Sequence, residues 1–128
     1  MRLTITALIL GSSLAGLSAQ LSYNRDVRPI LAENCFACHG PDKASREGEL
    51  RLDIREDALM MEAFVPGNPD DSEIVIRINT GDEEDLMPPR DSHKALTSEQ
   101  KSILAEWVRQ GAEYEPHWAY IAPKRPPV

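Results

Sequence analysis

The chain is poor in aromatic side chains, which usually supply much of the bulk of a small protein's core. Its 128 residues include two Phe, three Tyr and two Trp. A single domain of this length buries only about 60–65% of the surface that its unfolded chain exposes. A bound apolar group would stabilise such a small core, because the secondary-structure elements could pack against it.

The sequence also lacks an excess of basic residues and, beyond its first 20 residues, a long apolar run. Lys and Arg together number 14 against 21 Asp and Glu, and the formal net charge is −7 at pH 7. This charge makes nucleic acid a poor partner and favours a basic protein partner or none. No later segment has the ~20 apolar residues that a membrane span needs.

The amino-terminal segment, residues 1–19, is typical of a secretory signal peptide. Arg2 supplies the positive start, an apolar run follows to Leu17, and Ala19 precedes the expected cleavage site. A retained membrane anchor is the alternative, although the run is short and is interrupted by Gly11 and Gly16. Export predicts a periplasmic or cell-envelope location, with no membrane span left after cleavage.

Both cysteines of the chain lie in one pentapeptide, Cys35-Phe36-Ala37-Cys38-His39. Two thiols three positions apart, with a histidine directly after the second, are the attachment signature of c-type haem. The thiols would form thioethers to the two haem vinyl groups, and His39 would give the iron an axial nitrogen. We therefore predict one haem c per chain, bound covalently by Cys35 and Cys38, with His39 as the proximal ligand.

Three other uses of this pentapeptide stay open, namely a zinc site, a redox dithiol and a disulfide. A structural zinc normally takes four protein ligands. His93 or His117 would complete such a set in number, but His39 would rarely reach the same metal as the adjacent Cys38. A redox dithiol would lie between a strand and a helix, whereas the flanks of this pentapeptide have helical patterns.

The second axial ligand of the iron is predicted to be Met87, in the segment Met87-Pro88-Pro89. A thioether sulfur is neutral and soft, so it favours ferrous iron and raises the reduction potential. Pro88 keeps Met87 out of the helical region, and the two prolines stiffen the loop that carries the sulfur. Metal ligation by the chain would then come from His39 and Met87.

Met87 has rivals for this position, and one arginine is a candidate for a different haem contact. Met60 and Met61 lie in a predicted helix, where core packing is the ordinary use of methionine. His93 would give a bis-histidine centre of lower potential. Arg51 lies between two leucines that can both point inward, and it is a candidate to hold a haem propionate; a solvated arginine is the ordinary alternative.

Hydrophobic periodicity predicts an all-α fold. Val27, Ile30 and Leu31 recur at helical spacing and would face the core. Helices are expected at residues 23–34, 54–61, 72–79 and 97–110. They would form a small domain at residues 22–113, with the signal peptide before it and a proline-rich tail at residues 114–128 after it.

Two of these helices begin at a capping-box spacing. Asp53 precedes Glu56 by three residues, and Thr97 precedes Gln100 by three residues. We expect Trp107, on the last helix, to pack that helix against the first one. Between the helices, the four acids at residues 82–85 form either a solvated loop or a docking patch.

Taken together, these segments resemble the planctomycete-type cytochrome c domain. The pentapeptide is common to c-type cytochromes, whereas the combination of segments is specific to this family. The resemblance is carried by residues 23–31, 34–42, 50–53, 65–67, 87–89, 96–97 and 107–113, within a stretch from about residue 23 to residue 123.

The resemblance implies a small helical cytochrome c-like fold with covalent haem on Cys35 and Cys38 and with His39 as an axial ligand. Met87 falls in the family's Met-Pro-Pro segment, which supports its distal role. The family's module usually precedes large domains in a longer exported protein, so the tail at residues 114–128 is expected to be a linker to a downstream domain.

We therefore expect an exported monohaem c-type cytochrome module that carries single electrons and is not itself an enzyme. Its redox partner protein stays unknown. The alternatives are a haem-based enzyme or sensor with a distal site that opens, and a haem-free interaction module. No distal acid–base group is evident in the sequence, which argues against the enzyme.

Overall fold

A computed structural model of the chain describes residues 18–127, and these residues form helices and no strand. The all-α prediction is confirmed over this part of the chain, whereas the predicted signal peptide lies almost entirely outside it. The four α-helices are α1 (Arg28–Asn34), α2 (Arg55–Met60), α3 (Glu73–Asn79) and α4 (Ser98–Arg109). Shorter turns are the π-helical η1 (Tyr23–Val27) and the 3-10 turns η2 (Pro69–Asp71), η3 (Arg90–Ser92) and η4 (Trp118–Tyr120).

The first predicted helix is present as η1 followed directly by α1. Pro29 lies in the first turn of α1, where its missing N–H removes no intrahelical bond. Val27 and Leu31 have no exposed surface and Ile30 is buried, as their helical spacing predicts. This face of the helix therefore belongs to the core, and α1 delivers the chain to Cys35.

The core is centred on four aromatic rings where η1 packs on α4. The ring centroid of Trp107 lies 5.9 Å from that of Tyr23, 5.3 Å from that of Phe64 and 5.5 Å from that of Tyr114. The indole Nε1–H of Trp107 donates to the carbonyl of Glu113 over 2.9 Å, so its polar atom is satisfied. Trp107 thus packs the last helix against the first, as predicted.

Helix α4 begins where the sequence predicts, because its cap is local. The Thr97 hydroxyl accepts from the Gln100 N–H over 3.1 Å, and the Gln100 side chain accepts from the Thr97 N–H over 2.9 Å. After Gln110, Gly111 adopts φ +109°, a left-handed conformation that ends the helix.

The predicted capping box of α2 is wrong. The structure places Ile54 at the cap position with no side-chain hydrogen bond to the helix. The Asp53 carboxylate instead accepts two hydrogen bonds from Arg51, from Nε over 3.0 Å and from Nη2 over 2.5 Å. A fork-to-fork pair with arginine is stronger than a single bond to a helix amide, so the nearby guanidinium takes the carboxylate.

The packed domain extends beyond its predicted boundary at residue 113. The Tyr114 ring stacks on Tyr23 with centroids 4.3 Å apart, and its hydroxyl donates to the Leu52 carbonyl over 2.7 Å. The Glu115 carboxylate accepts from the Ser22 hydroxyl and the Asn24 N–H. The extended tail therefore starts after these residues, and within it Trp118 is 70% exposed.

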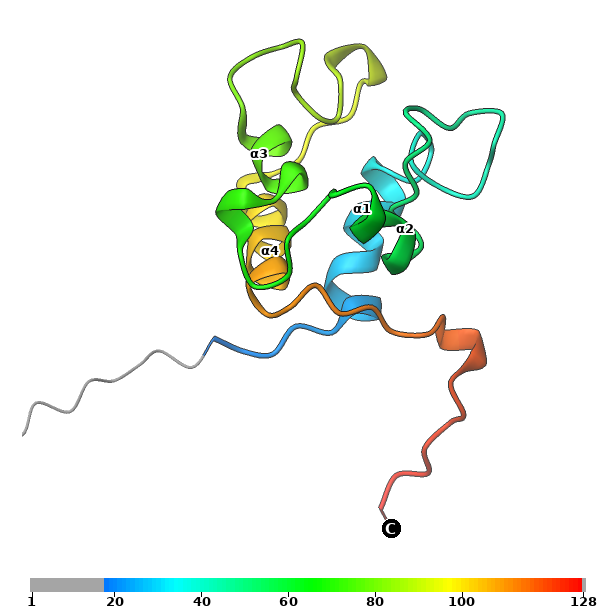
Figure 1. Cartoon of the computed structure of the whole chain (residues 1–128). Coiled ribbons are helices and arrows are strands. Elements are labelled where there is room, and N and C mark those ends of the chain that lie inside the picture. The colour runs from blue at the N-terminus through cyan, green and yellow to red at the C-terminus, as the bar shows by residue number, and fades with distance from the viewer. Residues whose placement is uncertain (1–17, 128) are drawn as a thin grey trace, which may run out of the picture.

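Helix α3 lies against α4, and two long loops project from the same end of the helical core (Figure 1). One loop follows α1 and leads to α2, and the other joins α3 to α4. The described ends of the chain leave from the opposite end of the molecule (Figure 1). Within residues 18–127, no helix has the length and apolar content to cross a membrane.

Candidate functional site

The C-x-x-C-H pentapeptide forms a turn that continues α1 into the first loop. The Cys35 N–H donates to the Leu31 carbonyl over 2.8 Å, and the His39 N–H donates to the Cys35 carbonyl over 2.8 Å. Both cysteines are free thiols, with Cys35 half-buried and Cys38 exposed. The two sulfurs therefore stand one turn apart on a segment fixed by the helix before it.

Gly40 explains how the chain leaves this turn. A Cβ atom at Gly40 would lie 2.2 Å from the Phe36 carbonyl oxygen, a distance that no real side chain occupies. Only glycine lets the backbone pass so close to the turn. The glycine after the histidine is therefore required by the shape of the loop.

His39 combines a half-buried ring with an uncommitted ring nitrogen. Its Nδ1 atom is buried and has no hydrogen-bond partner among the described residues. Burial lowers the pKa of His39, although the backbone of Glu47 and Leu50 acts in the opposite direction. A neutral imidazole is the form that binds a metal.

The Cys35 thiol is in an environment that suppresses its ionisation. Burial raises the pKa of Cys35 to about 11, while the positive charge of Lys94 acts in the opposite direction. A thiol protonated at neutral pH is a weak nucleophile. This environment does not suit the reactive thiolate of a redox dithiol.

Met87 lies in the second loop, held by its backbone. Its N–H donates to the Arg77 carbonyl at the end of α3 over 3.1 Å, and the following Pro88 is buried. The half-buried Met87 side chain borders a small cavity of about 120 Å³. The other residues that line this cavity are Ile78, Leu86, Pro88, Arg90, Lys94, Ala95, Leu96 and Lys101.

The structure brings the two predicted ligand segments to the same end of the molecule. The loops that carry His39 and Met87 both project from the same end of the helical core (Figure 1). One recorded hydrogen bond joins the Met87 loop to the helix before the pentapeptide. In it, the Lys94 ammonium donates to the carbonyl of Glu33, two residues before Cys35. No distance between His39 and Met87 follows from these contacts, so the distal role of Met87 stays a prediction.

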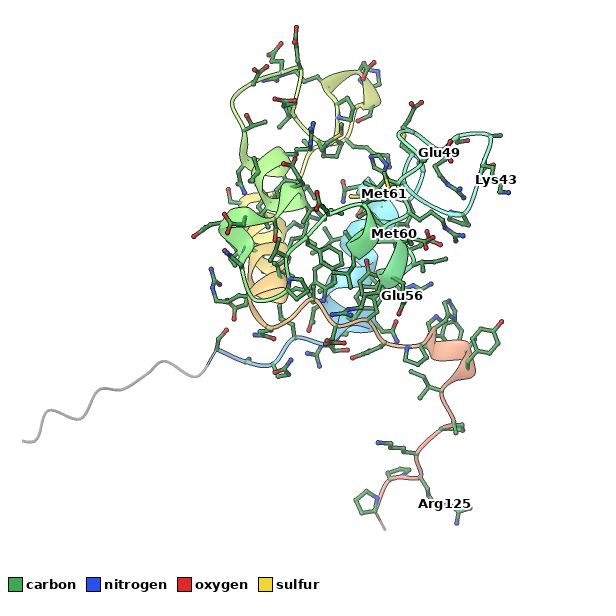
Figure 2. The ribbon with its side chains drawn as sticks, viewed as in Figure 1. Lys43, Glu49, Glu56, Met60, Met61 and Arg125 are labelled. Carbon is green, nitrogen blue, oxygen red and sulfur yellow. The ribbon has the colours of Figure 1, made fainter. Side chains whose placement is uncertain are left out.

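The rival ligands lie in more exposed places. Met60 is 76% exposed and Met61 is 49% exposed, both at the end of α2 (Figure 2). His93 is exposed and adopts a left-handed backbone with φ +57°. Arg51, the candidate for a propionate contact, is paired with Asp53, and its role toward haem also stays a prediction.

The side chains of the two loops and of the C-x-x-C-H turn are of the chemical types that bind haem. They offer an imidazole nitrogen, a thioether sulfur and two thiols at the attachment spacing. Several apolar side chains near these groups are only partly buried, as expected of surfaces left for a further apolar body. They are Phe36, Leu50 and Leu96. For zinc, residues 18–127 contain no group of three or more His, Cys, Asp or Glu side chains close enough to hold a metal ion.

Comparison with protein families supports the use in haem binding. Residues 35–91 match the family model described as Planctomycete cytochrome C. This segment is a planctomycete-type cytochrome c domain. The matched stretch begins at Cys35, includes His39, Arg51 and Met87, and ends before α4.

A planctomycete-type cytochrome c domain indicates haem binding and electron transfer, and so an electron-transfer module in place of an enzyme. The resemblance that the sequence showed is confirmed over the matched residues. Comparison with curated proteins and with solved structures gave no match.

Proposed function

We propose that this chain is an exported monohaem c-type cytochrome module that passes single electrons. Cys35 and Cys38 would bond to the haem, His39 would bind one face of the iron, and Met87 the other. The observation that carries the proposal is the turn itself, because it holds two thiols and an imidazole whose Nδ1 atom has no recorded partner, at the attachment spacing and within a matching family segment.

When bound, the haem would supply an iron that accepts and returns one electron. The chain's part is to hold that iron in a fixed environment. Thioethers at Cys35 and Cys38 would fix the position of His39 relative to the haem, because the turn continues α1 without a break. The thioether of Met87 would favour the ferrous state and raise the reduction potential.

Electron transfer is favoured over catalysis by the side chains around Met87. The lining of the cavity there is apolar or cationic, and its charged members are Arg90, Lys94 and Lys101. The residues that line this cavity include no histidine and no carboxylate, which are common general bases in enzymes. Two protein ligands would also leave the iron no open position for a substrate.

The remaining parts of the proposal concern location and partners. Residues 1–19 would direct export to the periplasm or cell envelope, where c-type haem is attached. The electron partner would be another protein or a domain downstream of the tail. The acidic charge of the chain suits a basic partner surface.

The direct test of the iron ligands is Met87→Ala in protein produced with the haem-attachment machinery. Loss of the sulfur–iron charge-transfer band in the ferric state is expected, together with a lower reduction potential. The matched control is the double variant Met60→Ala with Met61→Ala, which should leave both unchanged. An unchanged Met87→Ala spectrum would remove Met87 from the iron.

The spectrum of the unaltered protein separates the other functions. Low-spin iron with a sulfur ligand supports electron transfer. High-spin iron would favour a haem enzyme or sensor with an open distal site. Purified protein without any haem would favour an interaction module.

A further inference from the structure

Lys94 makes a contact that joins the loop carrying Met87 to helix α1. Its ammonium donates to the Glu33 carbonyl, in the last turn of α1 and two residues before Cys35. Lys94 lies 61 residues further along the chain than Glu33. Among the hydrogen bonds recorded within residues 18–127, this is the one that joins the loop between α3 and α4 to helix α1.

The same lysine borders the cavity that contains Met87. Its side chain lines this cavity together with Leu86 and Pro88. Its charge also acts on Cys35, since it lowers the pKa of that thiol against the effect of burial. Lys94 is thus close to one predicted haem attachment residue and to the predicted distal ligand.

Several contacts hold the loop that carries Met87. The Met87 N–H donates to the Arg77 carbonyl on α3, the Arg77 guanidinium donates to Asp85, and at the end of the loop Thr97 caps α4. These contacts tie the loop to the two helices that it connects. The Lys94 contact alone ties it to the helix that precedes the C-x-x-C-H turn, across the end of the domain.

We propose that Lys94 is a positioning residue that fastens the Met87 loop to the end of α1 and so keeps the thioether next to the iron. The part of this inference that concerns the iron rests on the proposed function. The fastening itself does not, because it joins protein to protein. The two parts therefore have separate measurements.

The fastening is tested by hydrogen exchange on the purified haem protein with Lys94→Ala. Amides at residues 86–96 should exchange about threefold to tenfold faster, as expected for the loss of one hydrogen bond. Lys94→Arg, which keeps a cationic donor, should restore slow exchange. Lys101→Ala is the matched control, because Lys101 lines the same cavity and its side chain has no recorded hydrogen bond within residues 18–127.

Equal exchange in Lys94→Ala, Lys101→Ala and the unaltered protein would overturn the proposal. This outcome is independent of which residue ligates the iron, so it can be told apart from failure of the proposed function. If the unaltered protein shows no sulfur–iron band, the proposed ligation fails while the fastening is still decided by exchange.

The effect on the iron is tested by adding imidazole to the ferric protein. Imidazole must displace the Met87 sulfur, which requires the loop to move. Lys94→Ala should raise the apparent affinity for imidazole by about threefold to tenfold, and Lys94→Arg should return it toward the original value. An affinity equal to that of Lys101→Ala would show that Lys94 does not position Met87.

Discussion

The two ends of this domain are built in different ways. At one end, the rings of Tyr23, Phe64, Trp107 and Tyr114 pack against one another, and the indole N–H and the Tyr114 hydroxyl have partners. At the other end, two long loops project beyond the helices, and the His39 Nδ1 atom is buried without a partner. The first end is held mainly by contacts between protein groups, with the Asn24 Oδ1 atom in η1 as its one recorded buried polar atom without a partner among residues 18–127, whereas the second end carries the residues that could hold a cofactor.

Leu52 connects the two ends. Its carbonyl accepts from the Tyr114 hydroxyl over 2.7 Å, and its N–H donates to the His39 carbonyl over 2.8 Å. The position of the His39 backbone is thereby set from the aromatic end. A small domain can thus keep a firm scaffold at one end and place cofactor ligands at the other.

Trp107→Ala breaks the aromatic end and should have the largest effect on stability. Removal of a buried indole leaves a cavity among three rings and costs about 3–5 kcal/mol of the free energy of unfolding. Denaturant unfolding of the haem-loaded protein measures this loss. Trp118→Ala is the control, because Trp118 is 70% exposed, and its effect should stay within about 0.5 kcal/mol. Equal losses for the two variants would contradict the division into two ends.

Gly40→Ala perturbs the loop end where the backbone passes closest to the C-x-x-C-H turn. The new Cβ would meet the Phe36 carbonyl, so the turn must shift, at a cost of about 1–3 kcal/mol. We also expect less haem-loaded protein per cell, measured by absorbance against total chain. Gly81→Ala is the matched control, since a Cβ at Gly81 meets nothing within 4 Å. A normal haem yield from Gly40→Ala would show that the turn tolerates the change.

Tyr114→Phe tests the connection between the ends and should have the smallest effect. The ring and its stacking remain, while the hydrogen bond to the Leu52 carbonyl is lost, at a cost of about 1 kcal/mol. Thermal unfolding should show the loss in both the haem-loaded and the haem-free chain, because the bond lies between protein groups. A loss confined to the haem-loaded chain would place Tyr114 in the cofactor site instead of the scaffold.

The sequence predicts well those features whose partners are near in the chain. The cap at Thr97 and Gln100 involves residues three positions apart, and the buried face of Val27, Ile30 and Leu31 follows from helical spacing alone. The cap predicted at Asp53 failed for a local reason too, because Arg51 competes for the same carboxylate. The spacing of residues in the sequence predicts which groups lie near one another. It does not predict which of two nearby partners a side chain will bond, as with Asp53 between the helix amide and Arg51.

Apart from the packing of Trp107 against the first helix, the sequence did not predict the contacts between residues far apart in the chain. Tyr114 looks like the start of a tail, yet its partners Tyr23 and Leu52 lie 91 and 62 positions away. Lys94 likewise has no local sign of its contact with Glu33. At the site, the residue types and spacing of the pentapeptide are enough to predict the haem attachment residues. The position of Met87 relative to His39 depends instead on the path of the long loop between α3 and α4, which the sequence pattern does not give.

Covalent attachment of haem is tested by mass spectrometry of the exported protein, purified from cells that attach haem. We expect coloured protein in which the peptide containing Cys35, Cys38 and His39 carries one haem through both sulfurs. Colourless protein whose two thiols are free, or joined to each other, would contradict this expectation.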